Sequence, residues 1–214
     1  MTTIDEVRRA AILRPLDETS WTARAKCAER LSAFYCRGML DAAGRGVAEE
    51  TFRLLSYDGE ILVRRVLAEC LKRASWLPRD IALALATDKS DVAVPFIEGS
   101  PSLADRDLLT ILRDHPGPHR LAIAGRESVS AEISDALCRC DDRAAAVAVL
   151  ANQEAAFALP TLHFLLDRSP ERPILEAIAR RRLLPIAVGE RLRGALEGRP
   201  GEAPCATMRE RVAI

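Results

Sequence analysis

The sequence has 214 residues, with 31 basic and 31 acidic side chains, so its formal net charge is zero. Hydrophobic residues make up 49% of the chain and aromatic residues only 4%. A chain with this many hydrophobic residues can bury a core, so the composition excludes an intrinsically disordered protein. The neutral balance argues against a protein whose main task is to bind nucleic acid or an acidic membrane. Alanine and leucine, with 35 and 28 residues, supply most of the apolar content, and this favours packed helices.

The sequence also bears on the compartment. No stretch approaches the roughly 20 apolar residues that a membrane span requires. Asp5 and Glu6 precede any apolar run, which is unlike a secretory signal. Six cysteines in a chain without an export signal are typical of reduced thiols. We therefore expect a cytoplasmic protein without a membrane segment.

Residues 1–57 predict helices that cap one end of a larger array. Residues 3–13 open with a capping-box pattern and predict a short helix. Ser20 is placed to cap a longer helix over residues 20–39. Gly44 and Gly46 would then separate that helix from another over residues 47–56.

Residues 58–197 contain a repeat of about 26 residues, in which apolar positions recur in register. The aligned columns are Leu71, Ile97, Ile123, Val149 and Leu175; Leu77, Leu103, Val129 and Ala155; Leu85, Ile111, Leu137 and His163; and Ala86, Leu112, Cys138 and Phe164. Chance would seldom align core and turn positions in the same register. We therefore treat the repeat as a structural unit.

Each unit predicts two short helices. In one unit the first helix contains Pro95, which would kink it, and ends at Gly99, which suits a left-handed C-cap. Acids recur where each second helix ends, and we interpret them as helix caps rather than as a row of catalytic or metal-binding carboxylates. These acids are Asp88, Asp114, Asp141 and Asp167.

Helices of about nine residues are marginal alone and must stack on their neighbours. The sequence therefore predicts an all-α fold: an α-solenoid (HEAT/armadillo-like) of two-helix repeats over residues 58–197. The helices of residues 1–57 would form its N-terminal cap, in one continuous domain. Residues 183–196 fit the last helix, and residues 198–214 read as a flexible tail.

Several phrases of the repeat resemble a known family. Val63–Leu71, Asp91–Pro101, Leu121–Ser130 and Val149–Asn152 are similar to segments of the alphaproteobacterial domain-of-unknown-function 2336 family. The resemblance covers about residues 20–180. It implies a helical, HEAT-like repeat domain from a bacterium of that class. It implies no activity, because no motif of that family has an assigned chemical role.

No combination of residues indicates a common catalytic or metal site. Cys138 and Cys140 are too closely spaced for a zinc pair and lack a second pair, and the column of Cys138 predicts a buried thiol. Pro116 and Pro118 place His115 in a turn, and the column of His163 predicts a hydrogen-bonded core histidine. We find no nucleophile elbow and no phosphate loop. We therefore expect no enzyme activity and no catalytic, cofactor or metal-binding residue.

The surface of the second helices is the candidate interaction face, because second helices line the concave side of HEAT-type arrays. In register it presents three rows of charges: Asp80, Arg106 and Glu132; Arg113 and Arg139; and Arg79 and Asp105. One interpretation is a solvated face with weak exposed ion pairs. The other is a groove whose mixed charge selects a protein partner. The function we predict is a non-enzymatic interaction module for a protein partner in bacterial signalling or regulation.

The alternative is a nucleic-acid-binding HEAT-like protein. Residues 180–182, Arg191 and Arg193 concentrate five arginines near the C-terminal end. Such a cluster would give salt-dependent binding to phosphates. Some alkylpurine DNA glycosylases have a HEAT-like fold, but they place aromatic side chains and a carboxylate around the lesion. Here Trp21 and Trp76 are far apart in the chain, which disfavours this alternative.

Overall fold

The computed structural model describes residues 20–168 and 171–197, which form twelve α-helices and no β-strand. The prediction of an all-helical protein is therefore confirmed for the described residues. The helix predicted over residues 3–13 and the tail predicted over residues 198–214 lie outside them.

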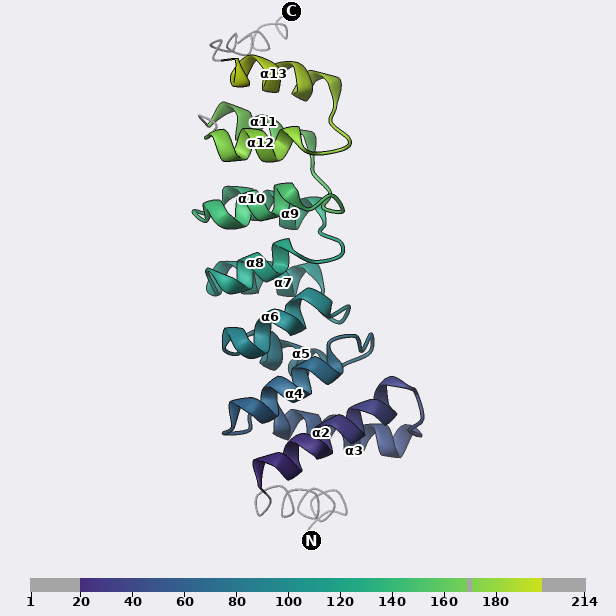
Figure 1. The fold of residues 1–214 in the computed structure, drawn as a ribbon. Helices are drawn as coiled ribbons and strands as arrows, with labels where there is room; N and C mark the ends of the chain where they lie inside the picture. The colour runs from purple at the N-terminus through teal and green to yellow at the C-terminus, as the bar shows by residue number, and fades with distance from the viewer. Residues whose placement is uncertain (1–19, 169–170, 198–214) are drawn as a thin grey trace, which may run out of the picture.

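The helices form two rows along an elongated molecule (Figure 1). The even row consists of α2 (Trp21–Cys36), α4 (Ile61–Leu71), α6 (Ser90–Gly99), α8 (Pro118–Ala124), α10 (Arg143–Ala151) and α12 (Arg172–Ala179). The odd row consists of α3 (Ala42–Leu55), α5 (Arg79–Ala86), α7 (Asp105–Asp114), α9 (Ala131–Arg139), α11 (Leu159–Asp167) and α13 (Ile186–Leu196). Consecutive even-row helices pack against one another, and in the odd row α3 contacts α5, α7 contacts α9, and α11 contacts both α9 and α13. The chain thus alternates between the rows, one helix pair at a time.

The core lies between the two rows, and most predicted columns line it. The columns that begin at Leu71 and Leu77 are buried at every position. Leu85, Ile111 and Leu137 are buried as well. The 26-residue register therefore holds for most of the array.

The register fails at α11, and the prediction of His163 as a core residue is wrong. Helices α5, α7 and α9 begin at residues 79, 105 and 131, but α11 begins at residue 159, two residues later than the repeat requires. The buried pair in α11 is consequently Leu165 and Leu166, while His163 and Phe164 are half-buried. The insertion moves these two aromatic side chains from the core to the edge of the odd row.

The N-terminal helices differ from prediction in their ends. Ser20 caps α2 as expected, with its Oγ accepting from the Ala23 backbone N–H. The helix ends at Cys36 rather than at residue 39, because Gly38 adopts a left-handed φ of 67° and closes a Schellman motif. The prediction that Gly44 and Gly46 separate two helices is wrong. Both lie inside α3, which begins after Asp41, whose carboxylate accepts from the Gly44 N–H at 2.7 Å.

Two further predictions of helix ends are wrong. Gly99 is the last residue of α6 and has no left-handed φ; among the described glycines only Gly38 and Gly117 do. The last helix begins at Ile186 rather than at residue 183, since Pro185 occupies its N-cap position. Pro95 lies inside α6 as predicted.

The acids predicted as helix caps bind arginines, and Asp88 also accepts from the Lys89 backbone N–H at 2.7 Å. Asp88 accepts from Arg64 of α4, and Asp167 accepts from Arg191 of α13. The N-cap positions of the following helices fall on other residues: Lys89, Gly117, Asp142 and Glu171. Asp142 does cap α10, through the Ala145 N–H at 3.1 Å. The residue that caps α10 therefore lies one position after the acid that was predicted to do so. The predicted acid, Asp141, forms an ion pair instead.

Successive repeats are joined by side chains that bind backbone carbonyls of the preceding repeat. We call Ser102, Arg126, Asn152 and Arg181 the turn-edge ladder. Asn152 Nδ2 donates to the carbonyl oxygens of Ala124 and Arg126, at 2.9 and 2.8 Å. Ser102 Oγ donates in the same way to the Ala74 carbonyl. Carbonyls in the last turn of an even-row helix, or in the turn that follows it, are thereby paired.

Two arginines make the strongest contacts of the ladder. Arg126 donates to the carbonyls of Ile97 and Ser100, the latter at 2.9 Å. Arg181 donates to Asn152 O at 2.8 Å, to Ala155 O at 2.7 Å and to Leu150 O at 3.2 Å. Burial lowers the pKa of the Arg126 guanidinium, and nearby Asp105 partly opposes this effect. The side chain nevertheless stays charged at neutral pH.

We predict that Arg126→Ala lowers the free energy of unfolding by about 2–4 kcal/mol, because it leaves two carbonyls of the preceding repeat without partners. Urea denaturation followed by circular dichroism measures this loss. Arg65→Ala is the matched control: Arg65 is exposed on the even row, and its loss should cost no more than about 0.5 kcal/mol. Equal losses for the two variants would contradict a structural role for the ladder.

A second prediction concerns acid stability. Burial raises the pKa of Asp88, but hydrogen bonds from Arg64 at 2.6 and 3.1 Å, together with one from the Lys89 backbone N–H, outweigh burial and leave the pKa lowered. A carboxylate whose pKa is lower in the folded state stabilises that state above its unfolded pKa of about 3.9, and this contribution disappears as the pH falls through the folded value. Asp88→Asn should therefore be less stable at pH 7 and lose less stability between about pH 5 and pH 3. Parallel pH profiles for the variant and the parent would show that the ion pair contributes nothing.

Candidate functional site

The seven predicted residues of the interaction face lie on three neighbouring odd-row helices. Arg79, Asp105 and residue 131 are the first residues of α5, α7 and α9. Asp80, Arg106 and Glu132 therefore occupy the same second position of the three helices. Arg113 and Arg139 lie in the last turns of α7 and α9, roughly 10 Å away along the helix axis. The predicted rows thus exist, but the face is divided between the two ends of the helices.

At α5 the predicted charges bind other repeats. Arg53 Nε of α3 donates to Asp80 at 2.5 Å, and this hydrogen bond lowers the pKa of Asp80. Arg79 donates from Nε and Nη2 to Asp107 of α7, at 2.8 and 2.5 Å. Both residues therefore join α5 to its neighbours, and their side chains stay about half exposed.

Asp107 is a structural residue that the sequence interpretation missed. Its exposed fraction is only 1%, and its other oxygen accepts from the Ala104 N–H at the start of α7. Within the described residues it stands at the third position of its helix, where α5 and α9 carry Ile81 and Ile133. The sequence did contain a sign of this role: Asp107 is an acid in an otherwise apolar column of the repeat. A buried carboxylate at such a position requires a cationic partner.

At α9 a second network holds Arg139. Its Nε donates to Asp135 at 2.8 Å, and its guanidinium lies 4.3 Å from the centre of the Phe164 ring on α11. Thr161 donates to the other oxygen of Asp135 at 2.7 Å. The hydrogen bond from Arg139 is the main cause that lowers the pKa of Asp135. Phe164, displaced from the core by the insertion, therefore covers Arg139 instead.

All seven residues are exposed, but four of them form no ion pair with another helix of the described residues and no contact with an aromatic ring. These four are Asp105, Arg106, Arg113 and Glu132, and the side chain of Arg106 reaches 75% exposure with only a 3.9 Å contact to Asp107. Arg113 binds its exposed neighbour Asp114 at 2.7 Å, and exposed pairs of this kind contribute little. Within the described residues, Asp105 and Glu132 have no ion pair. We call Asp105, Arg106 and Glu132 the N-terminal charge row of the odd row.

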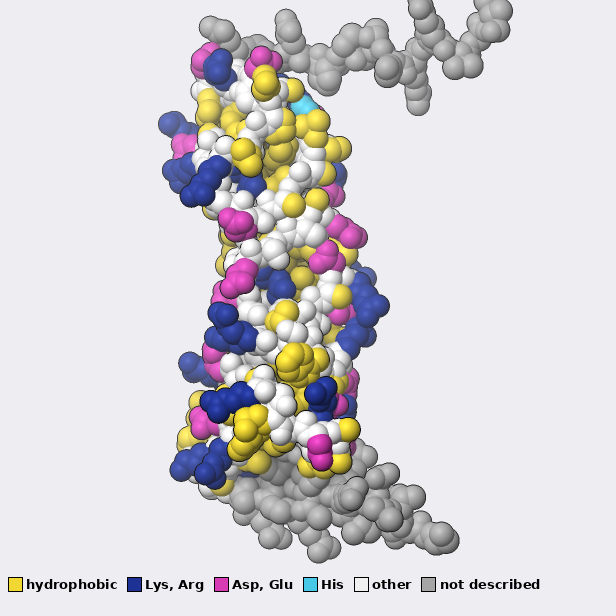
Figure 2. Space-filling model, turned by 90° about the vertical axis from the view of Figure 1, so that its right-hand side faces the viewer, with side chains coloured by type: hydrophobic (Ala, Val, Ile, Leu, Met, Phe, Trp, Pro, Cys, Tyr) yellow, Lys and Arg dark blue, Asp and Glu magenta, His cyan; other side chains and the backbone are white. Residues whose placement is uncertain are grey.

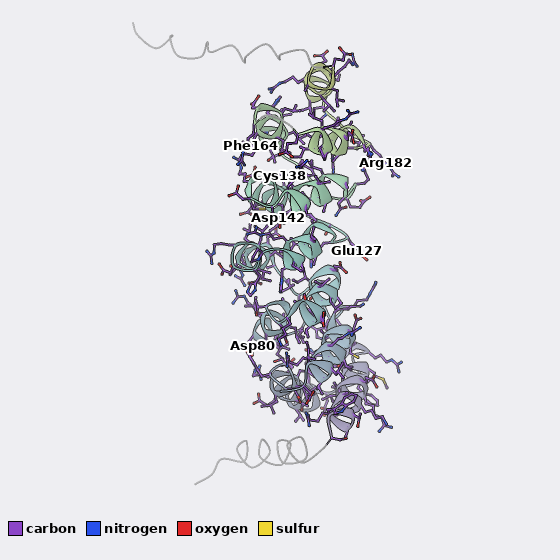
Figure 3. The ribbon with its side chains drawn as sticks, turned by 60° about the vertical axis from the view of Figure 1, so that its left-hand side comes forward. Asp80, Glu127, Cys138, Asp142, Phe164 and Arg182 are labelled. Atoms are coloured by element: carbon purple, nitrogen blue, oxygen red, sulfur yellow. The ribbon has the colours of Figure 1, made fainter. Side chains whose placement is uncertain are left out.

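Figure 3 shows the two sides of the stack that this division creates. Asp80 on α5 and Phe164 on α11 lie on one side, with the odd-row helices, whereas Glu127 and Arg182 project from the turns on the other side. The accessible charges of the predicted face thus belong to the side marked by Asp80 and Phe164. Arg126 and Arg181 of the turn-edge ladder directly precede Glu127 and Arg182 in the chain.

The arginine cluster behind the nucleic-acid alternative is also partly used within the molecule. Arg181 belongs to the turn-edge ladder and lies 4.5 Å from the centre of the Phe157 ring. Arg191 donates to Asp167 and to Nδ1 of His163, the latter at 2.6 Å. This leaves Arg180, Arg182 and Arg193 exposed.

The described residues contain no group of three or more His, Cys, Asp or Glu that could hold a metal ion. A cavity of about 310 Å³ lies between the turns that connect α9 to α10 and α11 to α12. Apolar side chains of Ala146, Leu165 and Ile174 line it, together with the ion pair between Arg143 and Glu171. Both side chains of this ion pair are about half exposed, so water reaches the opening of the cavity. The two opposite charges there neutralise each other.

Cys138 is one of the residues that line this cavity. Cys138 is buried, as the repeat predicts, and burial raises its pKa to about 12. We expect iodoacetamide at pH 8 to leave Cys138 unmodified in the folded protein and to modify it fully in guanidinium. Trypsin cleaves after Arg139 and so separates Cys138 from Cys140 for mass spectrometry. Rapid modification of Cys138 under native conditions would show that this part of the array opens.

None of the described helices is long and apolar enough to cross a membrane. No curated protein and no solved structure matches the chain. A model of a protein family does match: it is described as an uncharacterised protein conserved in bacteria (DUF2336) and covers residues 92–198, half of the chain. The match extends farther toward the C-terminus than the resemblance over residues 20–180 and does not include residues 20–91. The chain belongs to the bacterial family DUF2336.

Proposed function

We propose that the chain is an α-solenoid of HEAT/armadillo type that acts as a non-enzymatic module for binding a protein partner. The alternation of the chain between two rows of helices supports the solenoid architecture (Figure 1). The repeated burial of equivalent columns and the turn-edge ladder support it further. In such an array each repeat is stabilised by its neighbours, so its outer faces are free to vary.

The N-terminal charge row is the observation that carries the binding proposal. Arg106 and Glu132 occupy equivalent positions on adjacent helices, carry opposite charges and are both exposed. Neighbouring charges on the same face bind within the molecule, as Arg79 does to Asp107 and Arg139 to Asp135. These ion pairs hold the odd-row helices in place. The unpaired charges on those helices therefore face a partner at a constant spacing. A partner with the opposite charge order would gain specificity and association rate from this pattern.

The proposed setting is the bacterial cytoplasm, in signalling or regulation. The family is a bacterial one. The five described cysteines, Cys27, Cys36, Cys70, Cys138 and Cys140, are free thiols, which agrees with a reducing compartment.

We predict that exchanging the charges of the row, as Arg106→Glu with Glu132→Arg, weakens capture of the partner at least tenfold. The exchange preserves net charge, and neither side chain bridges two helices, so thermal stability should stay unchanged. Affinity purification from the host with quantitative mass spectrometry identifies the partner, and titration of the purified partner measures the loss.

The matched control is Arg65→Glu with Glu98→Arg, an equal charge exchange between exposed residues of the even row. This variant should bind like the parent. Equal binding by both exchanges would contradict the proposed face. A shift of labelled DNA at low salt that disappears after Arg180→Glu with Arg182→Glu would favour nucleic-acid binding instead.

A further inference from the structure

Helix α2 is the first described helix and lies at the N-terminal end of the stack (Figure 1). It packs on α3 and α4, and the side toward the core carries its buried residues: Ala25, Ala28, Ser32 and Tyr35. At about 100° per residue, Ala23, Cys27 and Phe34 lie on the opposite side of the helix. Phe34 is 49% exposed there. The outer side of α2 therefore presents apolar side chains away from the core.

A hollow of about 480 Å³ lies along this outer side, and its wall is almost wholly apolar. Within the described part of the chain, its lining comes from α2 alone: Ala23, Lys26, Cys27, Arg30, Leu31 and Phe34. Lys26 and Arg30 line it with their aliphatic stems. Figure 2 shows hydrophobic side chains next to those of Lys and Arg at this end of the stack. Whatever buries the hollow therefore comes from outside residues 20–168 and 171–197.

Residues 3–13, which precede α2, have an apolar side that fits this surface. The sequence predicts a helix for them, and Ile4, Val7 and Ala11 are spaced by three and four residues. Such a helix presents these three side chains on one face. Charged residues fall on the opposite face: Asp5, Glu6 and Arg9. The segment is thus amphipathic in the way that a helix lying on an apolar surface must be.

The segment also has the required length and reach. Eleven helical residues are about 16 Å long, which equals the distance along α2 from Ala23 to Phe34. Residues 14–19 can span up to about 20 Å, whereas packed helices lie only about 8–10 Å apart. They are therefore long enough for residues 3–13 to fold back antiparallel along α2. An attached segment has an effective concentration on the order of millimolar, which favours it over a separate molecule of similar character.

We propose that residues 3–13 form a helix that packs antiparallel on the outer side of α2, buries Ile4 and Val7 in its hollow, and shields Cys27 from solvent. The charged face of this helix then points outward, as the polar outer face of a terminal capping repeat does. The prediction of a cap over residues 1–57 leaves the position of this helix open. The placement does not depend on the partner proposed for the N-terminal charge row.

Alkylation of Cys27 by N-ethylmaleimide in the full chain tests the proposal. Cleavage after Glu18 and Glu29 releases residues 19–29, in which Cys27 is the only cysteine, for mass spectrometry. Ile4→Ala with Val7→Ala should raise the rate of modification by about tenfold or more, because the segment loses the side chains that hold it in the hollow. Alanine favours helix, so circular dichroism should show unchanged helix content.

The matched control is Glu6→Ala with Arg9→Ala, which shortens two side chains of the charged face and preserves net charge. Cys27 should react in this variant as slowly as in the parent, at every protein concentration between about 5 and 500 µM. Cys138 should stay unmodified in all three proteins, as expected if their arrays remain folded.

Three results would overturn the proposal. Cys27 could react as fast in the parent as in the Ile4→Ala, Val7→Ala variant, or the control could react as fast as that variant. Protection of Cys27 that increases with protein concentration would mean that a second copy, rather than residues 3–13, covers α2.

Discussion

The stack depends on side chains of the following repeat that bind carbonyls at or just after the ends of α4, α6, α8 and α10. Helices of seven to eleven residues in this array have too few internal hydrogen bonds to be stable alone. Arg126, Asn152 and Arg181 supply donors to those carbonyls and fix the turns that start the next odd-row helices. Apolar columns such as Leu71, Ile97 and Ile123 then complete the packing between rows. The stability of one repeat is therefore tied to the presence of the next.

Many charged residues of the odd row also join one repeat to the next. Arg53 with Asp80, Arg79 with Asp107, and Thr161 with Asp135 all join neighbouring helices of that row. These contacts explain how a chain with zero net charge can be rich in arginine without presenting a basic surface. They also reduce the predicted interaction face to the charges that no neighbour uses, of which Arg106 and Glu132 are the best placed.

The chain differs at its two ends. Toward the N-terminus, α2 and α3 are longer than the later helices and contain Tyr35 and Phe52, whose rings meet edge to face at 5.3 Å. Toward the C-terminus, the insertion before α11 moves Phe164 onto Arg139, and α13 leaves Ile186 and Leu196 exposed. The regular middle thus supplies an even spacing of helices, whereas the C-terminal part departs from the repeat and leaves apolar side chains exposed.

The sequence by itself determined the helical class, the 26-residue register and most of the core, because burial in stacked short helices follows an apolar periodicity that is visible without a structure. It also identified the equivalence of Asp80, Arg106 and Glu132. Only the tertiary structure decided which charges of the predicted face are paired, since Arg53 binds Asp80 and Asp107 binds Arg79 across repeats. It likewise decided the place of His163, because two extra residues before α11 change the register of that helix. Local periodicity can be recognised from the sequence, but ion pairs between residues 24 to 28 positions apart depend on how the repeats stack.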